Sequence, residues 1–255
     1  MPTRYLCQYR KRSAWWPNAG RRERGPVLKQ YRHEFKYELD HSSAVSIESR
    51  LRLLAQRDAH AGKKGSYTIR SLYFDDYDDT NYWDNESGSD PREKFRLRMY
   101  NGDPSFIQLE LKRKEHEKTL KLAVPVSTAL CEKILDGRRI AFEETSDSAL
   151  LRKFWLQQEM KYLHPCLLVE YDRTPYVYPE GNVRITFDRN IRGGPRWEDF
   201  LREETFLRPI MPVGCELMEV KYDQFLPDPI AHTVTSRRLH RTAYSKYYLC
   251  RTFAG

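Results

Sequence analysis

Residues 94–114 read KFRLRMYNGDPSFIQLELKRK, and their pattern is the strongest indication of the fold in the chain. On both sides of the turn sequence at residues 101–104, NGDP, apolar residues alternate with charged ones. Successive side chains of a strand point to opposite faces, and Asn-Gly is a strong signal for a hairpin turn. The stretch therefore predicts an antiparallel hairpin of residues 95–100 and 106–114 that has one apolar face and one ionic face.

The same pattern recurs in four further segments: 31–39, 167–172, 183–188 and 218–222. For any single strand, the ordinary interpretation is a polar face in contact with water. Solvated faces usually mix Thr, Ser, Gln and Lys, however, whereas these six faces consist almost entirely of Arg, Lys, Glu and Asp. The predicted ionic faces carry Arg32, Glu34, Lys36, Lys94, Arg96, Arg98, Glu110, Lys112, Lys114, Glu170, Asp172, Arg184, Asp188, Glu219 and Lys221.

The segment 167–172 illustrates the assignment of faces: Leu167, Val169 and Tyr171 are predicted on the apolar side, and Glu170 and Asp172 on the ionic side. Together the six ionic faces hold nine cations and six carboxylates, a net charge of +3. Crowded cations repel one another unless an anion lies among them, and a chain of phosphates suits guanidinium and ammonium groups. The carboxylates are then expected to hold a hard divalent cation, Mg²⁺ or Mn²⁺.

Helices are predicted between the strands at residues 42–58, 127–135, 148–163 and about 228–250. Ser42 or Ser43, Ser127 and Ser148 are suitable N-caps because a hydroxyl accepts hydrogen bonds from the free amides of a first turn. These helices need an apolar surface on which to pack. If they cover the apolar faces from outside, the ionic faces line the inside of a closed antiparallel β-barrel.

Composition limits the classes of protein to which the chain can belong. The 255 residues are 40% hydrophobic and 31% charged, without the run of about 18 apolar residues that a membrane helix requires. The five cysteines are an odd number, are widely spaced and form no CxxC pair, so neither a disulfide framework nor a zinc site is predicted. We therefore expect a cytoplasmic protein.

Charge is distributed unevenly along the chain. Residues 1–30 hold eight cations and one acid, and so carry almost all of the net charge of +8. We interpret residues 1–27 as a basic, disordered arm and residues 28–255 as the folded domain. The alternative is an arm that contacts anionic lipid, nucleic acid or polyphosphate.

From about residue 28 to residue 251 the sequence resembles the VTC domain, the catalytic module of vacuolar transporter chaperone complexes and bacterial polyphosphate polymerases. The resemblance rests on motifs that occur in the family's order: YRHEFKY at 31–37, YTIRSLYFD at 67–75, KFRLR at 94–98, LELKRK at 109–114, VEY at 169–171, RITFD at 184–188, EVKY at 219–222 and SKY at 245–247. The VTC domain belongs to the triphosphate tunnel metalloenzymes. The resemblance implies an α+β fold, a closed eight-stranded antiparallel barrel with helices outside, in which the γ-phosphoryl group of ATP passes to a polyphosphate chain.

The resemblance also implies roles for individual residues. Together with the ionic faces, it makes the candidate catalytic residues Lys36, Arg96, Arg98, Lys112 and Lys121. The candidate substrate-binding residues are Arg32, Lys94, Lys114, Arg173, Arg184, Lys221, Ser245 and Lys246. Glu219 is the expected principal ligand of Mn²⁺ or Mg²⁺, assisted by Glu34 or Glu110.

Three positions depart from the strand pattern or from the pattern of the family. Arg173 is assigned by resemblance alone, and we expect it to lie past the end of its strand. Arg32 stands where the superfamily has the first acid of Glu-x-Glu-x-Lys, which favours binding of long phosphate chains over simple triphosphate hydrolysis. Ala123 stands where many relatives have Arg, so one phosphate contact is expected to be missing.

Four functions are compatible with a cationic barrel. The favoured one is a polyphosphate polymerase with ATP and polyphosphate as ligands. The second is a tripolyphosphate or polyphosphate hydrolase on the same barrel, and the third is a non-catalytic polyphosphate-binding subunit, against which the presence of Glu219 argues. Nucleic-acid binding is disfavoured because residues 31–255 have a basic excess of only +1. A membrane or transporter partner is left open.

Overall fold

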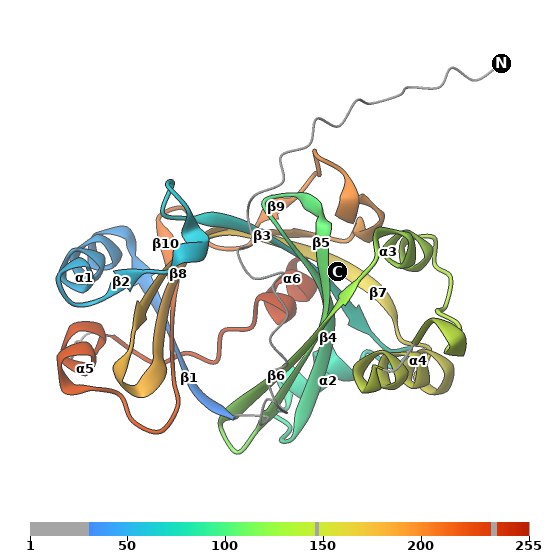
Figure 1. Ribbon diagram of the computed structural model, residues 1–255, viewed down its shortest axis with the longest axis horizontal. Helices are drawn as coiled ribbons and strands as arrows, with labels where there is room; N and C mark the ends of the chain where they lie inside the picture. The colour runs from blue at the N-terminus through green and yellow to red at the C-terminus, as the bar shows by residue number, and fades with distance from the viewer. Residues whose placement is uncertain (1–30, 146–147, 236–238, 255) are drawn as a thin grey trace, which may run out of the picture.

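The computed structural model describes residues 31–145, 148–235 and 239–254, so the predicted basic arm at 1–27 lies outside the described residues. Within the described residues, eight strands close into an antiparallel barrel in the order β1–β10–β8–β7–β3–β4–β5–β6 (Figure 1). Six of them are the predicted strands, and β3 and β6 complete the ring. The strands are β1 (Arg32–Asp40), β3 (Tyr67–Asp75), β4 (Arg92–Tyr100), β5 (Asp103–Glu115), β6 (Lys118–Val126), β7 (His164–Tyr178), β8 (Val183–Gly194) and β10 (Cys215–Tyr222).

The hairpin of β4 and β5 has the predicted turn. Tyr100 pairs with Asp103, and Asn101 and Gly102 connect them with φ values of 52° and 67°. A turn with two positive φ values matches the right-handed twist of the strands and favours Asn-Gly. The register then places Lys94, Arg96 and Arg98 on one face of β4, as the alternation predicted.

Helices cover the apolar faces from outside, which confirms the predicted arrangement (Figure 1). One layer, α3 and α4, packs on the apolar faces of β3, β4 and β5. A second layer, α1 and α5, packs on those of β1, β8 and β10. The helices are α1 (His41–Leu54), α2 (Thr80–Glu86), α3 (Thr128–Leu135), α4 (Ala149–Lys161), α5 (Asp228–Val234) and α6 (Lys246–Ala254). Short 3-10 helices lie at Ala59–Ala61 (η1), Phe142–Thr145 (η2), Glu180–Asn182 (η3) and Trp197–Leu201 (η4), and two-residue strands at Gln56–Arg57 (β2) and Arg208–Pro209 (β9).

The predicted caps are correct for two helices. The hydroxyls of Ser127 and Ser148 accept the amides that open α3 and α4. In α1, however, the cap is Asp40, whose carboxylate accepts from the amide of Ser43, and the helix ends at Leu54 rather than at residue 58. No helix within the described ranges has both the length and the apolar character needed to span a membrane.

The predicted C-terminal helix is wrong as a single element. The chain forms the two separate helices α5 and α6, and α6 lies inside the outline of the barrel (Figure 1). Strands β1 and β6 share only two residue pairs, so residues 239–245 complete the wall beside β1. There Arg241 forms a bridge with Tyr37, and the amide of Thr242 donates to the carbonyl of Lys36 at 2.9 Å. This connection brings the first turn of α6 into the bore.

The predicted faces of β7 are inverted. Tyr171 lies opposite Ile69 of β3 and lines the bore, and Val169 and Leu167 share its side. Glu170 faces outward instead, where its carboxylate binds Arg70 at 2.6 Å and Arg192 at 2.5 Å.

Asp172 also faces outward, and its carboxylate accepts hydrogen bonds from the side chains of Thr68 and Asn190. The physical reason for the inversion is α6, whose Tyr247 and Cys250 need an apolar inner wall. Arg173 is therefore not past the end of its strand. It lies within β7 on the same side as Tyr171 and points into the bore.

Candidate phosphate-binding site in the barrel

The bore of the barrel encloses a cavity of about 490 Å³. Within the described part of the chain, thirteen cations and three carboxylates line it. They include every cation proposed from the sequence, together with Arg92, which was missed. The lining cations are Arg32, Lys36, Arg92, Lys94, Arg96, Arg98, Lys112, Lys114, Lys121, Arg173, Arg184, Lys221 and Lys246. The lining carboxylates are Glu34, Glu117 and Glu219, and Ser245, a candidate substrate-binding residue, also lines the cavity.

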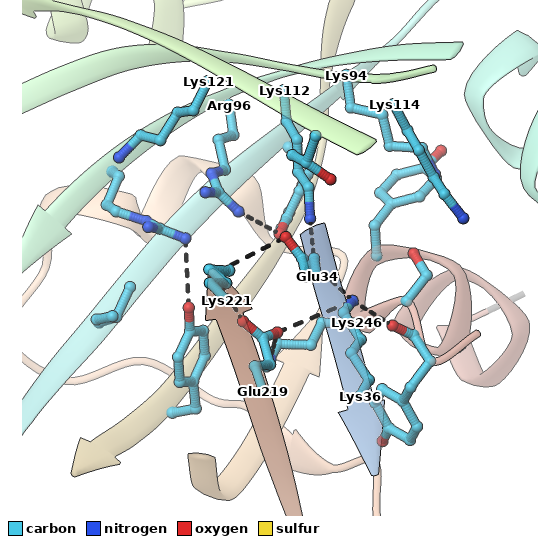
Figure 2. Close-up of a pocket in the computed structure, with 18 of the residues that line it drawn as sticks. Glu34, Lys36, Lys94, Arg96, Lys112, Lys114, Lys121, Glu219, Lys221 and Lys246 are labelled. Atoms are coloured by element: carbon cyan, nitrogen blue, oxygen red, sulfur yellow. Dashed lines mark hydrogen bonds and ion pairs between the residues drawn. The ribbon is translucent and has the colours of Figure 1, made fainter. Parts of the chain in front are cut away.

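Two walls of charged side chains face each other across the cavity (Figure 2). One wall belongs to β4, β5 and β6, and it is organised by Glu110, which is fully buried. The Glu110 carboxylate lies 2.7 Å from Arg96, 2.5 Å from Lys121 and 3.5 Å from Arg98. Glu110 does not line the cavity, so it binds these three cations from the side that faces away from the cavity. It differs in this respect from the two other proposed metal carboxylates.

The opposite wall belongs to β1 and β10 and contains Glu34 and Glu219. Lys36 lies between them, 3.6 Å from Glu34 and 3.8 Å from Glu219. Lys221 approaches the same two carboxylates at 3.9 and 2.9 Å, and Lys112 reaches Glu34 across the bore at 2.7 Å. This mutual proximity follows from the register, because Lys36 pairs with Glu219 and Glu34 with Lys221.

A third group lies where α6 enters the bore. Asp188 is fully buried, binds the guanidinium of Arg173 through both oxygens at 2.7 Å and contacts Lys246 at 2.6 Å. Lys246 also lies 3.2 Å from Glu219, and Arg173 lies 3.4 Å from it. The C-terminal helix is therefore connected by Lys246 to the carboxylate that the sequence marked as the principal metal ligand.

Tyrosine hydroxyls accept hydrogen bonds from several of the arginines in the bore. The ionic faces predicted from the sequence did not include these tyrosines. The hydroxyls of Tyr73 and Tyr171 accept from Arg96 and Arg98 at 3.1 and 3.3 Å. Arg184 likewise donates to a hydroxyl, that of Tyr67, at 3.0 Å. The available signal was the spacing of tyrosines in the motif at 67–75, which puts two of them on one face of β3.

Burial in the bore lowers the pKa values of three lysines. Burial, more than any other cause, lowers the pKa of Lys94 and of Lys112 to about 7, and neighbouring cations add to the effect. Burial lowers the pKa of Lys121 to about 8 although Glu110 opposes the shift. Burial by itself would raise the pKa of Glu34, but the surrounding lysines, Lys112 first, outweigh it and hold the pKa well below its usual range.

Glu34 and Glu219 suit a divalent cation that is also bound by substrate. Their carboxylates lie on neighbouring strands and share the same two lysines. The described residues contain no group of three His, Cys, Asp or Glu side chains that could hold a metal by themselves. Mg²⁺ commonly binds through one or two carboxylates and completes its shell with phosphate oxygens and water. The donor set fits that mode of binding.

The solved structures that this chain resembles share little sequence identity with it. No curated protein sequence matches the chain. Among solved structures, the PH1819 protein from Pyrococcus horikoshii OT3 is 14% identical with a TM-score of 0.46, covering 88% of this chain and 99% of its own. A putative adenylate cyclase from Bacillus halodurans is 13% identical with a TM-score of 0.46, covering 80% and 86%. The Mimivirus capping enzyme triphosphatase is 10% identical with a TM-score of 0.36, covering 76% and 82%.

The family model described as VTC domain matches residues 31–253, which is nearly the whole of the described barrel and its helices. The strands that carry the ionic faces and the helix that brings Lys246 into the bore all lie within this match. The chain therefore belongs to the VTC domain family, a member of the triphosphate tunnel metalloenzyme superfamily.

Proposed function

We propose that the protein is a polyphosphate polymerase that transfers the γ-phosphoryl group of ATP to the end of a polyphosphate chain inside the bore. The observation that carries this proposal is the lining of one enclosed cavity by thirteen cations together with Glu34 and Glu219. A ligand that satisfies so many cations at once must carry many negative charges at regular spacing. Phosphate chains have this property, and their oxygens accept the paired hydrogen bonds that guanidinium groups donate.

Positioning and charge neutralisation supply most of the acceleration in phosphoryl transfer. Arg96, Arg98 and Lys121 have fixed orientations because they share one buried carboxylate, and so they form a preorganised clamp for a triphosphate. Lys36 approaches from the opposite wall, and Lys112 extends from the wall of the clamp toward Glu34. Little reorganisation is needed when charge moves onto the leaving group, which is the condition under which such contacts contribute most.

The reaction needs no general base. A terminal oxygen of the polyphosphate chain is already anionic and attacks the γ-phosphorus. A new phosphoanhydride bond forms, the bond from the γ-phosphorus to its bridging oxygen breaks, and ADP leaves with that oxygen. Because no side chain has to accept a proton, a lining made chiefly of cations is compatible with this reaction.

Glu219, with Glu34 beside it, would hold a divalent cation, Mn²⁺ or Mg²⁺. When bound, that cation supplies neutralisation of charge on the phosphate oxygens. We assign a different role to Glu110, whose three cationic neighbours and complete burial make it the counter-ion that orients the clamp. Its removal should disturb the cations rather than the metal.

Synthesis of polymer from ATP is the direct test. The purified protein is incubated with ATP and Mn²⁺ or Mg²⁺, and the products are separated on a gel stained for polyphosphate while free phosphate is measured in parallel. A ladder of polymeric phosphate supports the proposal. Release of free phosphate from ATP or tripolyphosphate without polymer would identify a hydrolase on the same barrel, and binding without turnover would identify a polyphosphate-binding subunit.

A further inference from the structure

Asp75 is a fully buried carboxylate at the end of β3 that does not line the cavity. One of its oxygens accepts hydrogen bonds from the amides of Asp76 and Asn81 at 3.0 and 2.8 Å. The other oxygen accepts from the amide of Tyr82 at 3.2 Å and from the hydroxyl of Tyr247. Within the described residues Asp75 makes no ion pair, so these hydrogen bonds replace the hydration that the carboxylate loses on burial.

Tyr247 is the partner of Asp75 that comes from a distant part of the chain, 172 positions away. Burial raises the pKa of Asp75, and the hydrogen bond from Tyr247 opposes this shift more than any other contact does. The two residues end two of the motifs in the sequence, YTIRSLYFD at 67–75 and SKY at 245–247. Neither is among the candidate site residues, so their contact calls for a separate role.

Asp75 and Asp188 hold the first turn of α6 from two sides. Lys246 and Tyr247 are the first two residues of this helix. Tyr247 donates to Asp75 of β3, and Lys246 contacts Asp188 of β8 at 2.6 Å. Strand β7 lies between β3 and β8, and Tyr247 packs on its apolar inner side. The helix therefore lies across β7 with an anchor on each of the two neighbouring strands.

The two anchors respond differently to a ligand. Lys246 lines the cavity, and its ammonium group also lies 3.2 Å from Glu219 (Figure 2). A phosphate that binds Lys246 competes with Asp188 and Glu219 for the ammonium group, which weakens that anchor. The hydrogen bond from Tyr247 to Asp75 uses no group that binds phosphate, so it is retained when the bore is filled. Side chains of a binding site keep their geometry when supporting hydrogen bonds of this kind fix them.

Given the proposed function, on which this step rests, we infer that Asp75 is a positioning residue for the phosphate-binding Lys246. Through Tyr247 it keeps the first turn of α6 in place, so that Lys246 exchanges its carboxylate partners for phosphate without moving the helix. Asp75 lies outside the cavity lining and does not contact the ligand itself.

The test measures binding of metal-free tripolyphosphate by calorimetry, without turnover. Tyr247→Phe removes the hydroxyl and retains the ring, over which the ammonium group of Lys94 lies at 4.5 Å. This variant is measured both in the parent protein and in a Lys246→Gln background. Tyr248→Phe is the matched control, because the hydroxyl of Tyr248 connects the same helix to Glu86 of α2 at an exposed position.

Tyr247→Phe should weaken the binding of tripolyphosphate by about threefold to tenfold in the parent protein, since a charge-assisted hydrogen bond is lost. In the Lys246→Gln background it should change the affinity by no more than about twofold, because the cation that it positions is already gone. A purely structural role would give the same loss in both backgrounds. Tyr248→Phe should leave the affinity within about twofold of that of the parent protein.

Asp75→Asn is the second variant and should lower the affinity by a similar factor. Its combination with Tyr247→Phe should lower the affinity by no more than about twofold beyond either change alone, because both disrupt the same hydrogen bond. Asp76→Asn is its control, since Asp76 accepts from the amide of Thr80 at 2.9 Å in the first turn of α2, and it should bind like the parent protein. A thermal melt verifies that each variant is folded; if Asp75→Asn is not, Tyr247→Phe decides.

Three results would overturn the inference: an unchanged affinity of Tyr247→Phe in the parent protein, an equal loss in the Lys246→Gln background, or an equal loss in Tyr248→Phe. The proposed function is tested separately by the polymer assay. A protein that makes no polymer but shows the background-dependent loss would refute the polymerase and retain the positioning role of Asp75. A working polymerase without that loss would do the reverse.

Discussion

Replacement of Glu110 by Gln gives the most direct test of how the charged bore is held together. The carboxylate has no exposed surface and lies 2.5 Å from Lys121, 2.7 Å from Arg96 and 3.5 Å from Arg98. The amide retains the shape but not the charge, so three cations lose their shared counter-ion. Removing one partner of a buried ion pair costs about 3–5 kcal/mol. For a domain of this size, about 1 kcal/mol corresponds to 2–4 °C, so the thermal midpoint should fall by about 6–20 °C.

The assay is thermal unfolding of Glu110→Gln with and without polyphosphate. The added anion should recover more stability in the variant than in the parent protein, because it supplies the missing negative charge to the same cations. Glu93→Gln is the control, since Glu93 contacts Arg113 and Lys153 near the surface and its loss should cost no more than about 1 kcal/mol. Equal and small shifts for the two variants, or no difference in the effect of polyphosphate, would refute the assigned role of Glu110.

The direction of the pH dependence follows from the same group. Burial alone would raise the pKa of Glu110, but Arg98, Arg96 and Lys121 outweigh it and hold the pKa well below its usual range. A carboxylate with a lowered pKa in the folded state stabilises the protein above its unfolded pKa, and that contribution is lost as the pH falls. The difference in stability between the parent protein and Glu110→Gln should therefore be largest near neutral pH and should shrink below about pH 4.5.

Three further outcomes are expected. Arg98→Ala should lower the rate of polymer synthesis by about 10²–10³-fold, as for other preorganised donors, while the protein remains folded; robust synthesis by this variant would contradict the proposed clamp. Tyr171→Phe removes the hydroxyl that Arg98 contacts at 3.3 Å and should weaken tripolyphosphate binding by about threefold to tenfold, whereas Tyr176→Phe, on the outer face of the same strand, should lower the melting temperature without weakening binding. Because Lys94 and Lys112 have pKa values of about 7 in the free protein, binding should take up protons and strengthen as the pH falls from about 9 to 7; calorimetry in buffers of different ionisation enthalpy would detect this, and a pH-independent affinity would count against it.

The ionic faces of five strands could be predicted because alternation along a strand is a local property. The residues of β4 and β5 needed only the turn at Asn101 and Gly102 to fix their register, and the structure has that register. The sixth strand, β7, could not be assigned in the same way. Both of its faces are buried, since α6 covers Val169 from inside and ion pairs with Arg70 and Arg192 bury Glu170 from outside.

The different roles of the three carboxylates could not be predicted from the sequence either. Glu34, Glu110 and Glu219 occupy equivalent positions in the alternating pattern, and each is followed two residues later by a lysine. Only packing separates them, because Glu110 is enclosed by three cations behind the wall whereas the other two reach the cavity. The local pattern predicts on which face of a strand a side chain lies, but not how deeply that side chain is buried.

Local periodicity was enough to predict strands with an apolar and an ionic side, helices that cover the apolar side, and an enclosed charge that is mainly positive. These properties depend on residues a few positions apart. Three features depend instead on tertiary packing: α6 enters the bore, β7 turns Tyr171 inward, and Glu110 lies behind the wall with its cations. Those outcomes depend on the distances between residues far apart in the chain, which are set by closure of the barrel rather than by local periodicity.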